Sequence, residues 1–451
     1  MDIIVYSTQS SPRVEYIVST LMNAMGLNKI HFTNNQIIYT NSTEIKCNYS
    51  SNPVAKNELW IQPCTLLFEQ GINIHSVEFS NWNTTLSGVN NNSDSNYLPC
   101  FFPTTKGDLP FDIFAASFYL LTRYEEYLPH NKDMYGRYAH ENSMAFQHNF
   151  LTIPLVNLWL KELKEIIKQK NTGIILSNPT FKFIPTYDID IAWSYLHKGF
   201  IRNAGGFVRD LMKVKLHSLK ERLQTITGKT KDPFDCYDWL YDVHESKDFK
   251  PIYFFLVTAQ NKGLDKNILP DKNAMQKLIK AHAEKYKIGI HPSWQSNDKF
   301  EILINEIKLL SKISGKAVNK SRQHYIRMSL PNTYQELIAA GITDDYSMGY
   351  GSINGFRASY CLPYKWYNLE KETTTDLTIH PFCYMDANSF YEQHFNAAQA
   401  FEEMKYYYQI AKEVNGELIT IWHNHFLGYE KMFEGWRNNY QSFIEDCVKI
   451  K

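Results

Sequence analysis

The sequence lacks the signatures of three classes of protein. Its seven cysteines are scattered and never spaced as CxxC, so they indicate neither a disulfide framework nor a thiolate zinc site. Its longest apolar stretch, around residues 114–121, is far too short to span a bilayer. It also has no net charge, since 47 basic residues balance 47 acidic ones, so no global field would attract nucleic acid or an anionic membrane.

A secretory leader is not evident at the N-terminus either. The first 16 residues contain no basic segment followed by an apolar run and a cleavage site, and they are typical of a first strand instead. Together with the unpaired cysteines, this predicts a protein of a reducing, cytoplasmic compartment.

Aromatic residues, by contrast, are abundant. They make up 15% of the chain, with 30 Tyr and 9 Trp. Sugar-binding clefts use such rings as flat apolar platforms, but a chain rich in Tyr, Asn, Ile and Lys together is also what an AT-rich genome encodes. The composition alone leaves both explanations open.

The length predicts two domains, because single hydrophobic cores rarely grow beyond about 250–300 residues. We expect a smaller α/β domain of unassigned role at residues 1–175 and a (β/α) barrel-like domain at 176–451. In the second part, strand-like segments alternate with helical ones, a pattern typical of a parallel sheet or barrel. Functional groups are then expected at the carboxyl ends of strands.

Polar side chains follow four of these strand-like segments. The first ends in Asp188 and Asp190, which project from the same edge of an ideal strand and together favour a bound cation. His291 follows the second, and an imidazole there can bind zinc or another divalent ion. The third presents Arg322, His324 and Tyr325, and the fourth ends in His423. Each signal is weak alone, and together they indicate a catalytic metal site.

The order and spacing of these segments resemble the polysaccharide deacetylases of the NodB-homology type over about residues 181–451. TYDID resembles the first motif of that family, IGIHPSWQS the second, SRQHY the third and LITIWH the last. The resemblance implies a distorted (β/α) barrel. The roles it implies are general base for Asp188, metal ligands for Asp190 and His291, orientation of the base for Arg322, an oxyanion-facing amide for Tyr325 and general acid for His423.

The middle motifs depart from the family pattern. Gln295 stands where the second metal histidine is expected, and Gln323 and His324 replace two prolines. We therefore predict that His324 supplies the missing ligand, with zinc as the favoured ion. The stretches at 232–235, 344–350 and 355–364 resemble a bacterial branch of the family with an extra N-terminal domain and similarly altered motifs.

Four residues are candidate substrate contacts: Tyr325, Arg357, Trp294 and Trp422. A guanidinium can bind a carboxylate or phosphate, but a structural ion pair of Arg357 with a partner such as Asp345 is an equally good explanation. His423 could likewise be a core histidine packed against Trp422.

The resemblance implies a metal-dependent hydrolase that removes an N-acyl, usually N-acetyl, group from an amino sugar or glycan precursor. The alternative from another class is a non-catalytic carbohydrate-binding protein on a degenerate barrel, which the Gln295 substitution supports. A scaffolding role of the N-terminal domain is a third possibility without positive sequence support.

One insertion, residues 199–231, follows the first motif and is rich in Lys and Arg. Apolar residues recur in it at helical spacing, beside cationic ones that include Arg209, Lys213, Lys220 and Arg222. This pattern suits peripheral contact with a membrane, or a lid that grips the phosphates of a lipid- or nucleotide-linked sugar. A helix packed on the barrel with a solvated basic face would give the same pattern.

Overall fold

The computed structural model describes residues 2–83, 97–245, 247 and 250–446. The polar, turn-rich stretch at residues 83–96 lies mostly outside the described residues, as does Cys447. The six cysteines that are described are all free thiols. None of the described helices combines the length and the apolar character needed to cross a membrane.

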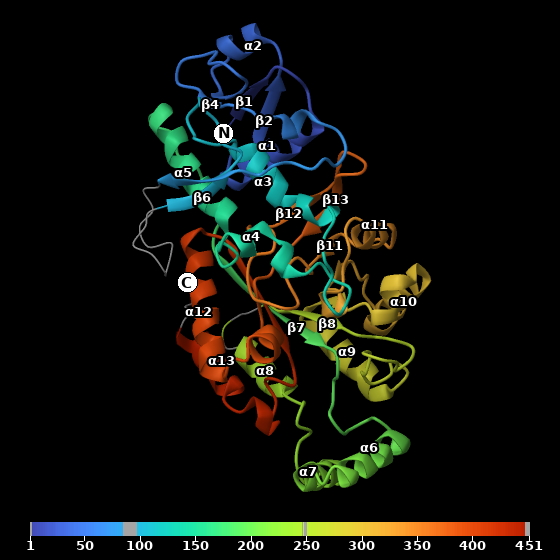
Figure 1. Cartoon of the computed structure of the whole chain (residues 1–451). Coiled ribbons are helices and arrows are strands. Elements are labelled where there is room, and N and C mark those ends of the chain that lie inside the picture. The colour runs from blue at the N-terminus through green and yellow to red at the C-terminus, as the bar shows by residue number, and fades with distance from the viewer. Residues whose placement is uncertain (1, 84–96, 246, 248–249, 447–451) are drawn as a thin grey trace.

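The N-terminal part is built around a small parallel sheet in the order β2-β1-β3-β4 (Figure 1). Its strands are β1 (Asp2–Ser7), β2 (Lys29–Thr33), β3 (Ile45–Tyr49) and β4 (Leu59–Ile61). An antiparallel pair, β5 (Phe79–Asn83) and β6 (Tyr97–Phe101), lies beyond them in the chain. The helices of this part are α1 (Pro12–Ala24), α2 (Gln36–Asn41), α3 (Ile113–Leu121), α4 (Met144–Gln147) and α5 (Leu155–Lys170).

The short run QIIY at residues 36–39 is of a composition typical of a strand, but it is helical in the structure. The run begins α2, because the Asn35 side chain accepts hydrogen bonds from the amides of Ile37 and Ile38 and so caps a helix. A four-residue apolar run carries too little periodicity to distinguish the two structures.

The C-terminal part contains a nine-stranded sheet in the order β12-β13-β11-β10-β9-β8-β7-β15-β14. All neighbours are parallel except β12 and β13. The strands are β7 (Lys182–Ile189), β8 (Ile252–Phe255), β9 (Lys287–Ile290), β10 (Lys320–Ser321), β11 (Asp344–Asp345), β12 (Tyr364–Asn368), β13 (Thr373–Ile379), β14 (Tyr384–Met385) and β15 (Glu417–His423). The predicted fold class, an α/β chain with a large parallel-sheet domain behind a smaller α/β part, is confirmed.

Helices cover this sheet from both sides in Figure 1, with α9 and α10 on one side of β7 and β8 and with α12 and α13 on the other. The helices of this part of the chain are α6 (Phe200–Met212), α7 (Leu216–Ile226), α8 (Tyr237–Glu245), α9 (Asn273–Lys285), α10 (Phe300–Ser314), α11 (Asn332–Ala339), α12 (Ala397–Glu413) and α13 (Trp436–Asp446), of which α6 and α7 do not cover the sheet. Strand β15 is buried along its whole length, as is usual for a parallel sheet covered on both faces.

The two parts share one continuous hydrophobic core. Buried ion pairs also join them: Arg13 contacts Glu372, and Glu126 contacts Arg357. The Tyr16 hydroxyl donates to the Lys365 carbonyl at 2.8 Å. The N-terminal part is therefore packed firmly against the larger sheet.

Candidate active site

The carboxyl ends of four strands of the large sheet, β7, β9, β10 and β15, bring the candidate residues together. β7 lies between β15 and β8, and its register places the Cα of Asp188 opposite that of His423. His291 follows β9, and Arg322 follows β10. The third strand-like segment is shorter than expected, since β10 ends at Ser321 and a 3-10 turn, His324–Ile326, follows. This turn directs His324 toward the strand ends.

Asp190, His291 and His324 form a cluster with the geometry of a metal site. One ligand atom from each lies within 4.8 Å of the others, and the described part of the chain contains no other such group of three. The His291 Nε2 atom is 3.0 Å from Asp190 Oδ1, and the His324 Nε2 atom is 3.6 Å from Asp190 Oδ2. The structure thus places His324 where the sequence predicted a substitute ligand.

Asp190 also shows that the cluster fits a cation. Its Oδ1 atom is buried and accepts no hydrogen bond from any described residue, even though His291 is close. Burial alone would raise the pKa of Asp190, but His324 and His291 lower it well below its usual value, so the carboxylate is ionised. One carboxylate and two imidazoles are the N and O ligands that zinc binds in catalytic sites.

Each of the two histidines is oriented by a contact of its other ring nitrogen. His291 Nδ1 donates to the Arg322 carbonyl oxygen at 2.6 Å, and its Nε2 atom points toward Asp190. His324 Nδ1 lies 3.0 Å from the fully buried Asp265 carboxylate, which also accepts from the Trp294 amide. Such outer contacts fix the tautomer and direction of metal-binding imidazoles.

Asp265→Asn is expected to weaken metal binding by about 10–100-fold, because the His324 ring loses its charged acceptor. Competition with a chromogenic chelator measures this change. Asp298→Asn is the matched control, since Asp298 pairs with Arg327 at the surface. Equal affinities of wild type and Asp265→Asn would show that Asp265 does not orient a ligand.

Asp188 lies beside this cluster and contacts Arg322. The Arg322 Nη1 atom is 3.7 Å from Asp188 Oδ2, and Nη2 donates to the Thr186 hydroxyl at 2.9 Å. The guanidinium is also held over the rings of Phe254 and Phe382. Asp188 Oδ1 is buried and has no hydrogen-bond partner among the described residues. Arg322 is therefore positioned to orient Asp188, with one carboxylate oxygen left available.

His423 completes the site and has a partner that the sequence did not reveal. Its Nδ1 atom is 2.6 Å from Asp386 Oδ1, and its Nε2 atom is 3.5 Å from Asp190 Oδ2. Burial lowers the pKa of His423, but Asp386 and then Asp190 and Asp188 raise it, to about 10. His423 is therefore not a neutral core histidine packed only against Trp422.

These residues line a cavity of about 350 Å³. Tyr325 and Tyr391 contribute rings to its wall, and the N-terminal part contributes Tyr135 and Arg137. Arg137 Nη1 donates to the Tyr325 carbonyl at 2.7 Å, which braces a residue with a left-handed backbone (φ 59°). The N-terminal part thus builds one side of the site.

Three of the four expected substrate contacts do not line this cavity. Arg357 is buried and makes a bidentate contact with Glu126, so its ion-pair explanation is correct, with Glu126 rather than Asp345 as the partner. Trp422 is fully buried against Phe401 and Tyr440. Trp294 packs on Tyr325 and under Arg327, and so supports the wall from behind.

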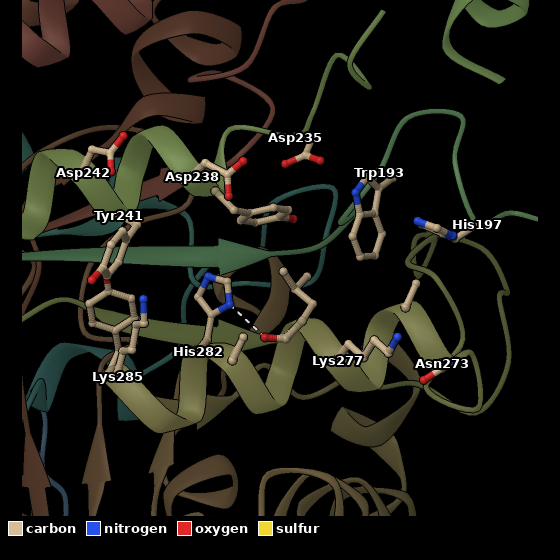
Figure 2. Close-up of a pocket in the computed structure, with 15 residues that line it drawn as sticks. Trp193, His197, Asp235, Asp238, Tyr241, Asp242, Asn273, Lys277, His282 and Lys285 are labelled. Atoms are coloured by element: carbon tan, nitrogen blue, oxygen red, sulfur yellow. Dashed lines mark hydrogen bonds between the residues drawn. The ribbon is translucent and has the colours of Figure 1, made fainter. Parts of the chain in front are cut away.

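A larger cavity of about 810 Å³ lies elsewhere, between α8 and α9 (Figure 2). Asp238 and Asp242 face it from α8, and Lys277 and Lys285 from α9. None of its lining residues belongs to the Asp190 cluster. One of its two histidines, His282, has a pKa lowered by burial to about 4 and is neutral.

Residues 3–172 match the model of a family of unknown function, DUF7033. No curated protein matches the chain. Among solved structures, similar folds include a candidate polysaccharide deacetylase from Mycobacterium smegmatis (12% identity, TM-score 0.39) that aligns over 60% of this chain and 85% of its own. Puue allantoinase (12% identity, TM-score 0.37) aligns over 59% and 84%. A probable polysaccharide deacetylase from Pseudomonas aeruginosa PAO1 gives the same values as the allantoinase.

Proposed function

We propose that this protein is a metal-dependent hydrolase that removes an N-acyl group, usually N-acetyl, from an amino sugar or glycan precursor. The observation that supports this most is the convergence of Asp190, His291 and His324 beside Asp188 and His423, in the order of the deacetylase-like motifs. Zinc is the proposed ion, and a cytoplasmic location remains part of the proposal.

The residues divide the chemistry between them. A divalent ion held by the three ligands would polarise the acyl carbonyl and lower the pKa of water. Asp188 has a free carboxylate oxygen to take a proton from the attacking water, while Arg322 restrains the other oxygen. His423 is protonated at neutral pH because its pKa is raised to about 10, so it can give a proton to the leaving amine.

The cavity supports a small, polar and partly flat substrate. Its volume is at the lower end of small-molecule sites, and the rings of Tyr135, Tyr325 and Tyr391 line it together with Arg137. Rings suit the apolar face of a sugar, and Arg137 offers hydrogen-bond donors to its oxygens. We therefore place a single amino-sugar unit at the cleavage position.

The purified protein is expected to carry about one divalent ion per chain and to release acetate from at least one N-acetylated amino sugar, free or nucleotide-linked. Elemental analysis and an acetate assay measure both, and a strong chelator should abolish the release. If the protein binds such sugars but neither retains metal nor releases acetate when zinc is supplied, the non-catalytic carbohydrate-binding function is correct instead.

A further inference from the structure

The insertion after the first motif forms a helical hairpin that projects from the body of the molecule. α6 and α7 are joined by a three-residue link, and Figure 1 shows them well separated from the sheet and its covering helices. At its base, Arg202 donates to the carbonyl oxygens of Lys266 and Asn267. Asn267 in turn hydrogen-bonds the backbone of Ile189 and Ala192, next to Asp190. The hairpin is thus attached directly beside the candidate site.

Polar contacts hold the two helices together. Arg222 of α7 is buried between them, where it donates to Asp210 at 2.6 Å and to Asn203 at 3.2 Å. Its guanidinium also lies over the Tyr195 ring. Gly206 provides the space, since a Cβ there would lie 2.7 Å from the guanidinium. Arg222 therefore belongs to the interior of the hairpin and not to the cationic surface expected from the sequence.

The apolar side chains, in contrast, point outward. Those of α6 recur at one-turn spacing and form a single stripe of Phe200, Ile201, Phe207, Val208, Leu211 and Met212. Ile201 and Met212 are 86% and 80% exposed. Val214, Leu216, Leu223 and Ile226 extend the surface over the link and α7. Single exposed apolar residues are common, but a stripe of them along one face of a helix is typical of an interaction surface.

This arrangement excludes one explanation of the insertion, a helix packed on the barrel. A helix packed on the barrel would bury its apolar stripe, but in the hairpin the buried residues include Asp210, Arg222 and Thr225 while the stripe faces solvent. Of the apolar residues of the two helices, Leu219 is buried, while the stripe of α6 takes no part in the buried contacts between them.

Basic residues indicate what covers the stripe. Exposed Arg209, Lys213, Lys215 and Lys220 lie among and beside the apolar side chains. The insertion 199–231 has eight Lys and Arg against two Asp and Glu, although the whole chain has no net charge. An exposed apolar face beside basic residues is the combination that places a helix in the headgroup region of an anionic bilayer. We infer that the α6–α7 hairpin docks the protein on an anionic lipid surface.

Vesicle sedimentation with the full-length protein tests this inference. Binding to phosphatidylcholine vesicles that contain phosphatidylserine is expected to exceed binding to phosphatidylcholine alone and to fall at high salt. Val208→Asp with Met212→Asp should weaken binding at least about 10-fold, because the apolar face no longer enters the interface. Both side chains are exposed, so unfolding curves should stay unchanged.

The matched control is Ile37→Asp with Ile38→Asp on α2, which removes two equally exposed apolar residues outside the hairpin. Binding of this variant should equal that of wild type. Replacement of Arg209, Lys213 and Lys220 by Glu should remove the preference for anionic vesicles. The affinity for these vesicles is expected to fall by roughly fivefold for each residue replaced. Absence of vesicle binding by the wild-type protein would overturn the inference. The inference would also fail if the wild-type protein were an oligomer that the Val208 and Met212 substitutions convert to a monomer, because the stripe would then be a protein contact.

Discussion

Asp188→Asn and Asp190→Asn are expected to inactivate the protein in different ways. Asp188→Asn removes the proposed base and should lower turnover by about 10²–10⁴-fold, while metal affinity changes little. Asp190→Asn removes a ligand and should weaken metal binding by more than the roughly 100-fold that an outer contact costs. Each substitution replaces one carboxylate oxygen by an amide nitrogen, and the two positions are two residues apart in the sequence. Each variant is therefore the control for the other.

Two measurements on each variant, the metal content after dialysis and the rate of acetate release, separate the two outcomes. Loss of metal in Asp188→Asn with retention in Asp190→Asn would mean that the roles are exchanged. Retention of metal in both variants would place the ion elsewhere and contradict the proposed site.

Glu126→Gln is expected to destabilise the protein by about 3–5 kcal/mol, measured by urea unfolding at neutral pH. The Glu126 carboxylate accepts from Arg357 at 2.6 and 2.8 Å and from Arg123 at 2.7 Å, and all three side chains are buried. Its loss leaves the buried Arg357 without its carboxylate partner and removes one of the two carboxylates that contact Arg123, the other being Glu125. Glu165→Gln, at an exposed pair with Lys168, is the control and should cost at most about 1 kcal/mol.

The pH dependence of the same variant gives a second measurement. Burial would raise the pKa of Glu126, but Arg357 and Arg123 lower it to about 2. The folded pKa is below the unfolded value of about 4.3, so the pair stabilises the protein above that value and loses its effect as pH falls toward 2. The difference between wild type and Glu126→Gln should therefore shrink below about pH 4. A difference that is the same at pH 3 and pH 7 would contradict the ionised pair.

The sequence by itself determined the strands that carry the site and most of the residues at their ends. β7 and β15 are mostly apolar segments that carry Asp188 and His423 at their carboxyl ends, and the carboxyl ends of parallel strands meet at one edge. That rule makes spatial neighbours of residues more than 200 positions apart. It also allowed His324 to be predicted near Asp190 in place of the histidine absent at Gln295.

Only the tertiary structure decided which polar groups support those residues. Asp265 lies in the loop between β8 and α9, and Asp386 follows the two-residue strand β14. The sequence around them has no periodic pattern. Nothing local therefore indicates that Asp265 contacts His324 or that Asp386 contacts His423. Glu126 and Arg357 are separated by 231 residues, and Arg137 reaches Tyr325 across 188.

The hairpin shows the same division between sequence and structure. Helical spacing in the insertion determines that α6 has one apolar face, because 3.6 residues make a turn. It does not determine what that face contacts, since a stripe buried on the sheet and a stripe facing solvent have the same spacing. The choice depends on the position of the helix relative to the rest of the chain, and here Arg222, Asp210 and Gly206 occupy the inner face and leave the apolar one exposed.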